Sequence, residues 1–183
     1  MNLPNKLSIA RILLIPMIIA AMYFDTVPMD IVALALFCIA ALTDYFDGHI
    51  ARKQGIITNF GRFIDPVADK MLVISAFVMM VARGVMPAWI LVAIIFRELF
   101  VDGLRMIASA GGIIIAAGKL GKLKTVIQIA AIIGLFVQRF ISDLVLPVGI
   151  LVWAAFLVTL WSGIDYFLKN KHVFQEPREE KHR

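Results

Sequence analysis

A single uncharged run near the end of the chain constrains the fold more than any other feature of the sequence. From Leu144 to Ile164 no residue carries a charge, and a helix of this length matches a bilayer core about 30 Å thick. The remainder is almost as apolar, since 61% of the 183 residues are hydrophobic and the mean hydropathy is +0.90. Soluble domains contain only about half apolar residues. The chain is therefore predicted to be one integral membrane domain of the all-α class.

Six spanning helices are expected, at residues 8–24, 31–52, 62–82, 85–106, 122–140 and 144–168, preceded by a short interfacial segment that starts at residues 2–5. The uncharged parts of the second, third and fourth spans are only about a dozen residues long and cover roughly 20 Å. A half-helix that carries ionisable residues must complete each of these three spans. Residues 1–168 form the predicted catalytic domain, and residues 169–183 a cytoplasmic tail that mixes charges and is expected to be mobile.

The basic residues are distributed unevenly between the two predicted membrane faces. The connection at residues 25–30 holds no Lys or Arg, whereas the opposite ends of the spans carry most of the cations that give the net charge of +5. The positive-inside rule then puts both termini and all charged half-helices on the cytoplasmic side. This asymmetry explains the basic charge through membrane orientation, so no nucleic-acid partner is expected.

Two adjacent predicted helices each present acidic and small residues on one face, because residues three or four apart share a helix face. The pattern consists of Asp44, Asp47, Gly48, Ala51 and Arg52, followed by Gly61, Asp65 and Asp69. Four carboxylates this close repel one another in a low dielectric unless a cation lies among them. All-oxygen ligands suit Mg²⁺, Mn²⁺ or Ca²⁺, and a pair of such ions about 4 Å apart is the geometry of in-line phosphoryl displacement.

Small residues in this pattern let helices approach closely and leave room for a substrate. Arg52, one turn after Gly48, is placed to contact a phosphate through two hydrogen bonds. Two other readings start from the same acids: pairing with basic residues or proton relay, and transport of a cation across the membrane. A cation carrier needs a polar route to both faces, and the opposite halves of the spans hold almost no polar groups.

The pattern from Asp44 to Asp69 resembles the motif of the CDP-alcohol phosphatidyltransferase family. Members of this family have six transmembrane helices, usually form homodimers, require Mg²⁺ or Mn²⁺ and displace CMP from a CDP-linked lipid with an alcohol. The resemblance implies metal ligation by Asp44, Asp47, Asp65 and Asp69, with Asp69 also the general base. It implies contacts with the CDP group by Gly48, Ala51, Arg52 and Gly61.

The rest of the chain is most similar to bacterial members of that family whose acceptor is glycerol 3-phosphate. The likeness lies in residues 2–11, Arg97-Glu98, Leu104-Arg105 and residues 121–125. It implies transfer of a phosphatidyl group from CDP-diacylglycerol to the sn-1 hydroxyl of glycerol 3-phosphate, in contact with the lipid of the bacterial inner membrane. Inositol phosphate and phosphatidylglycerol remain alternative acceptors.

A dianionic acceptor needs cations near the metal site. The residues expected to bind its phosphate are Arg97, Arg105, Lys119, Lys122 and Lys124. Cytoplasmic cations are also expected from topology alone and bind anionic lipid headgroups. Glu98 is expected to pair with Arg97, Asp102 has no assigned partner, and Tyr166 is expected to be an interfacial anchor.

Overall fold

The computed structural model describes residues 3–54, 59–113, 115 and 118–174, without the side chains of residues 3–4, 44–54, 59–60, 62–63, 172 and 174. These residues form helices and connecting turns, which confirms the all-α class. The long helices are α1 (Leu3–Tyr23), α2 (Val27–Gln54), α3 (Asn59–Ala82), α4 (Ala88–Ala110), α5 (Lys119–Val137) and α6 (Val145–Asn170), with short 3-10 helices η1 (Ser142–Leu144) and η2 (Lys171–Phe174). Each predicted span overlaps one long helix.

Three helical stretches of the described chain are long and apolar enough to cross a membrane: Asn5–Tyr23, Lys119–Val137 and Ser142–Asn170. Val27–Thr43 is a shorter apolar helix of the same character. The helices that fall short, α2, α3 and α4, are the ones in which charged residues replace apolar ones over one half of the length. Crossing of the membrane by all six helices stays a prediction.

The two ends of the chain differ in detail from the predicted boundaries. The interfacial segment predicted before the first span is wrong as a separate element for the described residues, since α1 runs without a break from Leu3. Pro4 lies in the first turn of α1, where a missing N–H removes no intrahelical hydrogen bond. At the other end α6 continues to Asn170, and η2 follows it directly. Residues 175–183 of the predicted tail lie outside the described residues.

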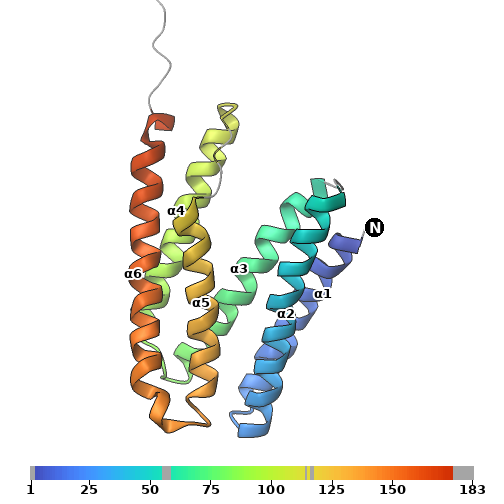
Figure 1. Ribbon diagram of the computed structural model, residues 1–183, viewed down its shortest axis with the longest axis vertical. Coiled ribbons are helices and arrows are strands. Elements are labelled where there is room, and N and C mark those ends of the chain that lie inside the picture. Colours follow the sequence, from blue (N-terminus) through green and yellow to red (C-terminus); the bar gives the residue numbers. More distant parts are fainter. Residues whose placement is uncertain (1–2, 55–58, 114, 116–117, 175–183) are drawn as a thin grey trace, which may run out of the picture.

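The helices run alternately up and down, so the start of α1 and the end of α6 lie toward the same end of the bundle (Figure 1). Helix α1 packs mainly against α2 and α3, and α6 packs mainly against α4 and α5. Contacts between these two groups are fewer, and they involve α3 with α4 and α5 and α2 with α5. Figure 1 shows α1–α3 and α4–α6 as two groups that diverge toward the upper end.

Two glycines end helices where the backbone must turn into the left-handed region. Gly84 follows α3 with φ +70°, and Gly112 follows α4 with φ +75°. After α3, the N–H of Val85 donates to the carbonyl of Met80 and the N–H of Gly84 to that of Val81. The same pair of hydrogen bonds closes α4, and this arrangement satisfies the last free carbonyls of each helix.

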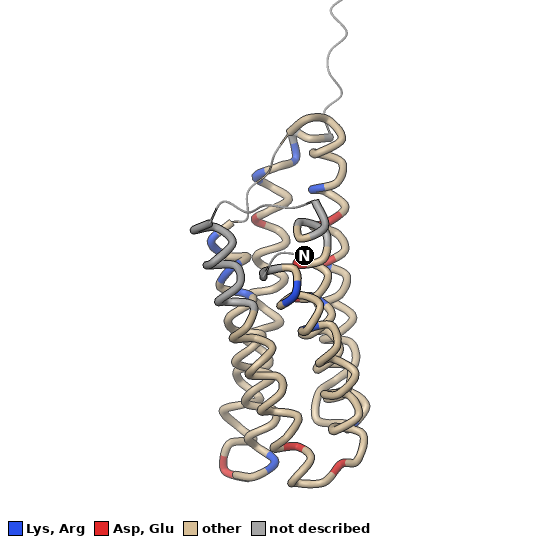
Figure 2. The backbone as a smooth tube through the Cα atoms, turned by 90° about the vertical axis from the view of Figure 1, so that its right-hand side faces the viewer, with Lys and Arg blue, Asp and Glu red and all other residues tan. Residues whose placement is uncertain are grey.

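Charged residues gather toward the two ends of the bundle, with an apolar stretch between them (Figure 2). At the end away from the chain termini, the fully buried carboxylate of Asp30 pairs with Arg83 Nη1 at 2.5 Å and Arg139 Nε at 2.9 Å. Arg139 also pairs with Asp25 at 2.9 Å. Because Asp25 and Asp30 belong to the first group of helices and Arg139 follows α5, this cluster joins the two groups at that end.

Candidate active site

The acidic pattern predicted from the sequence falls on two helices, α2 and α3. Its first part occupies the second half of α2, whose backbone is helical as predicted. The side chains of these residues, Asp44, Asp47, Gly48, Ala51 and Arg52, lie outside the described part of the chain. The second part lies on α3, where Gly61 is in the first turn and Asp65 and Asp69 follow one turn apart.

Two residues of α1 contact these α3 aspartates. Ser8 Oγ donates a hydrogen bond to Asp65 Oδ1, and Arg11 Nη1 donates to Asp69 Oδ1 in an ion pair. The side chain of Arg11 is fully buried, while that of Asp69 is 45% exposed. From the sequence, Arg11 was one of the cytoplasmic cations and the last residue of the N-terminal resemblance, and no contact with Asp69 was predicted. A lone arginine within the apolar run of α1, one turn after a serine, was the available sign of this contact.

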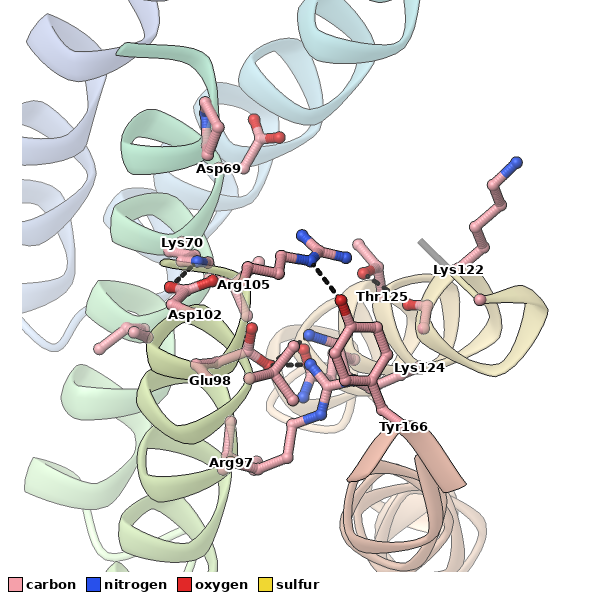
Figure 3. Close-up of a pocket in the computed structure, with 18 of the residues that line it drawn as sticks. Asp69, Lys70, Arg97, Glu98, Asp102, Arg105, Lys122, Lys124, Thr125 and Tyr166 are labelled. Atoms are coloured by element: carbon pink, nitrogen blue, oxygen red, sulfur yellow. Dashed lines mark hydrogen bonds and ion pairs between the residues drawn. The ribbon is translucent and has the colours of Figure 1, made fainter. Parts of the chain in front are cut away.

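A cavity of about 390 Å³, lined by charged residues and by apolar ones, lies between the two groups of helices. Asp65, Asp69 and Lys70 of α3 line one side of it, and residues of α4, α5 and α6 line the rest. In Figure 3, Asp69 stands at one end of this space, and the charged side chains of α4 and α5 reach into it from other helices. The fold therefore brings the predicted general base and the predicted acceptor site to one cavity.

Four of the five cations predicted to bind the acceptor phosphate line this cavity: Arg97, Arg105, Lys122 and Lys124. Lys119, the first residue of α5, is not among the described residues that line it. On α4, Glu98, Asp102 and Arg105 follow at spacings of four and three residues, so they share one face of the helix. Both signs of charge thus meet in the cavity.

Glu98 is the centre of a buried charge cluster. Its Oε1 accepts from Lys124 Nζ on α5 and lies 3.4 Å from Arg97 Nη1, which confirms the expected pair with Arg97. The three side chains are only 8% to 10% exposed. Burial of a charge is costly unless it is paired, so Glu98 stabilises both cations in the interior. The contact with Lys124 was not predicted, because it joins residues 26 positions apart.

Asp102, which the sequence left without a partner, forms an ion pair with Lys70 Nζ. This pair crosses from α4 to α3 and bridges the two groups of helices at the cavity. Arg105 Nε donates a 2.9 Å hydrogen bond to the hydroxyl of Tyr166 on α6. Tyr166 is not the lipid-exposed anchor that was expected, since the residue is only 7% exposed and lines the cavity.

The donor set suits a hard divalent cation. Asp65 and Asp69 offer carboxylate oxygens from consecutive turns of α3 to the same cavity, and Mg²⁺ or Mn²⁺ is bound through such oxygens shared with substrate phosphates. Among the residues whose side chains the structure describes, no group of three or more His, Cys, Asp or Glu comes together as a metal site. The remaining predicted ligands, Asp44 and Asp47, fall outside that set.

Apolar helices of membrane-spanning length, together with a cavity lined by acids and cations, define a membrane protein that carries charged side chains between its helices. A profile of the CDP-alcohol phosphatidyltransferase family matches residues 1–161. The chain belongs to this family, and the resemblance inferred from the residues between Asp44 and Asp69 is confirmed.

Similar proteins match most of the chain. A CDP-diacylglycerol--glycerol-3-phosphate 3-phosphatidyltransferase of Bacillus subtilis (strain 168) is 44% identical over 183 residues, covering 92% of this chain and 95% of that protein. A probable phosphatidylglycerophosphate synthase of Mycobacterium tuberculosis is 39% identical, covering 90% and 79%. A CDP-diacylglycerol--glycerol-3-phosphate 3-phosphatidyltransferase of Rickettsia felis is 36% identical, covering 94% and 97%.

Proposed function

We propose that this protein transfers the phosphatidyl group of CDP-diacylglycerol to the sn-1 hydroxyl of glycerol 3-phosphate, giving phosphatidylglycerol phosphate and CMP. The observation that carries the proposal is the shared cavity, in which Asp65 and Asp69 of α3 face cations of α4 and α5. The names of the similar proteins support the same reaction and the same two substrates.

In this proposal the acids bind one substrate, the CDP-linked lipid, through a metal ion, and the cations bind the other, glycerol 3-phosphate. Asp65 and Asp69, with Asp44 and Asp47 of α2, would hold Mg²⁺ or Mn²⁺ against the diphosphate of the lipid. A bound divalent ion supplies charge neutralisation at the diphosphate and orients it for displacement. The nucleotide end belongs to the α2 face, where Gly48, Ala51 and Arg52, with Gly61 of α3, are the predicted CDP contacts.

In the proposed reaction Asp69 acts as the general base. It removes the proton from the sn-1 hydroxyl, and that oxygen attacks the phosphorus bonded to the diacylglycerol oxygen. The bond between this phosphorus and the oxygen bridging to CMP breaks, and CMP carries the electron pair away. The ion pair with Arg11 fixes one oxygen of Asp69, so the carboxylate is held in a defined orientation at the cavity.

The acceptor is a small dianion, and two of the cations at the cavity lie in the protein interior, in addition to the surface cations that membrane orientation requires. Arg97 and Lys124 are buried beside Glu98, rather than displayed at a lipid-facing surface. Glu98 balances only one of these two positive charges, so the cluster keeps a net positive charge beside the cavity. This net charge favours a phosphorylated acceptor over a neutral alcohol.

The proposed setting is the bacterial inner membrane, with the cavity and both chain ends on the cytoplasmic side and with the protein as a homodimer. The apolar helices and the bacterial relatives support a membrane location. The start of α1 and the end of α6 lie toward the same end of the bundle (Figure 1), and most Lys and Arg of the described chain lie toward that end (Figure 2). The positive-inside rule expects such an end on the cytoplasmic side.

The test is release of CMP by purified protein from CDP-diacylglycerol and Mg²⁺ or Mn²⁺ with a panel of alcohols. The panel contains glycerol 3-phosphate, inositol phosphate, phosphatidylglycerol, serine and inositol. The proposal expects release with glycerol 3-phosphate, and release with a different member alone would reassign the acceptor. No release with any of them, together with uptake of Mn²⁺ into sealed vesicles, would favour a carrier.

Asp69→Asn tests the general base. Turnover is expected to be abolished while binding of CDP-diacylglycerol persists, since the metal ligands on α2 and Asp65 remain. Asp143→Asn, an exposed aspartate in η1, is the matched control and should keep full activity. Equal loss of turnover and of lipid binding in Asp69→Asn would contradict the base role.

A further inference from the structure

We propose that Tyr166 is a positioning residue for the acceptor-phosphate site, where its hydroxyl and ring hold the guanidinium of Arg105 ready to grip a phosphate. The inference rests on the proposed function, because it names how that site achieves its affinity for a phosphorylated alcohol. It starts from one contact that joins residues 61 positions apart, on α4 and α6.

Arg105 and Tyr166 are joined by two kinds of interaction. Arg105 Nε donates to the Tyr166 hydroxyl at 2.9 Å, and the Arg105 guanidinium carbon lies 5.4 Å from the centre of the Tyr166 ring. Figure 3 shows the two side chains meeting across the cavity. A cation within about 6 Å of an aromatic ring is attracted by its π-electrons. Both interactions restrict the orientation of a side chain that is otherwise long and mobile.

The two partners differ in burial. Tyr166 is 7% exposed and packs with Val101 and Leu104 of α4, while Arg105 is exposed at the cavity. The packed ring of Tyr166 therefore holds the guanidinium of Arg105, which faces the cavity. If Tyr166 served packing alone, its buried hydroxyl would only cost free energy, because a polar group would lose its contact with water. The hydrogen bond from Arg105 offsets that cost.

The bonding pattern leaves the terminal groups of Arg105 available to bind a phosphate. Only Nε of Arg105 is used by Tyr166, and within the described residues no hydrogen bond or ion pair engages Nη1 or Nη2. These terminal groups can donate two parallel hydrogen bonds to a phosphate. The Tyr166 hydroxyl accepts from Nε and thereby fixes the direction in which these two groups point.

The other cations of the cavity are less suited to this task. Lys70 is paired with Asp102, and Arg97 and Lys124 are paired with Glu98. Lys122 is exposed, and in Figure 3 its side chain extends away from the cluster. Among the described residues that line the cavity, Arg105 is therefore the cation that is both held in place and paired with a neutral group. Its full charge is available to an anion.

Tyr166→Phe tests the proposal, since it removes one oxygen and keeps the ring. The KM for glycerol 3-phosphate should rise about tenfold, which is the usual effect of losing one hydrogen bond to a charged group. The kcat and the KM for CDP-diacylglycerol should stay within about twofold of the parent protein. Tyr23→Phe is the matched control, because Tyr23 is 79% exposed and ends α1, at the end of that helix away from Ser8 and Arg11.

A double-variant cycle separates positioning from general stability. In the Arg105→Lys background, Tyr166→Phe should change the KM for glycerol 3-phosphate by less than about twofold, because the held guanidinium is already gone. Independent, multiplicative effects of the two substitutions would overturn the inference. So would an unchanged acceptor KM in Tyr166→Phe, or equal shifts in the KM of both substrates.

The acceptor used by the unsubstituted protein shows whether a negative result contradicts the role of Tyr166 or the proposed function. If the parent uses inositol phosphate instead of glycerol 3-phosphate, the function is reassigned, and Tyr166→Phe must still raise the KM for that phosphorylated acceptor. If the parent uses only an alcohol without a phosphate, both conclusions fall. If it uses glycerol 3-phosphate and the acceptor KM of Tyr166→Phe is unchanged, only the inference falls.

Discussion

Substitution of Glu98 by Gln should destabilise the protein more than any exposed carboxylate substitution. Gln keeps the size of the side chain and one acceptor oxygen, but it removes the negative charge that faces Arg97 and Lys124. All three side chains are 10% exposed or less. Two cations would then share the interior of the bundle without a counter-charge in this cluster.

The magnitude follows from the burial. Removal of one partner from a buried ion pair costs about 3–5 kcal/mol, and the retained hydrogen bond from Lys124 puts Glu98→Gln near the lower limit. For a chain of this size, 1 kcal/mol corresponds to about 2–4 °C in the melting temperature. A cost of about 3 kcal/mol therefore predicts a melting temperature lower by about 6–12 °C.

The assay is thermal unfolding of the purified variants in detergent, with Asp165→Asn as the control. Asp165 pairs with Lys169 at 2.8 Å, and the lysine side chain is 70% exposed, so loss of that pair should cost less than about 1 kcal/mol. In the double variant Glu98→Gln with Lys124→Met, part of the lost stability should return, because one unpaired charge is gone. A melting temperature of Glu98→Gln within about 2 °C of the parent would refute the reasoning.

Three further outcomes are expected. Gly163→Ala should lower stability by about 1–3 kcal/mol and raise the acceptor KM, since the new methyl carbon would lie 3.0 Å from Arg97 Cγ; thermal unfolding and kinetics measure both. Asp30→Asn should lower the melting temperature, because it removes a buried partner of Arg83 far from the cavity, while kcat/KM at low temperature stays unchanged; a large loss of kcat/KM would contradict this. EDTA should stop CMP release and added Mn²⁺ restore it, and Asp65→Asn should need more Mn²⁺ for half-maximal rate, whereas an unchanged Mn²⁺ requirement would remove Asp65 from the metal site.

Much of the fold was predictable because the information is local. Uncharged apolar runs, completed on three spans by half-helices with ionisable residues, are properties of neighbouring residues, so the positions of the six long helices followed from the sequence with small errors at the ends. The same locality placed Asp65 and Asp69 on one face of α3. The short segment expected before the first span is part of α1 from Leu3 onward, because a proline in a first turn is compatible with the helix.

The membrane character, the helix positions and the acidic and small residues at helical spacing were determined by the sequence alone, since each depends on residues within a few turns. The tertiary structure alone decided which side chains meet: Arg11 with Asp69, Lys70 with Asp102, and Arg105 with Tyr166. These partners lie 32 to 61 positions apart. The rotation and depth at which one apolar helix packs on another depend on side-chain fit along their whole length, which no local pattern specifies.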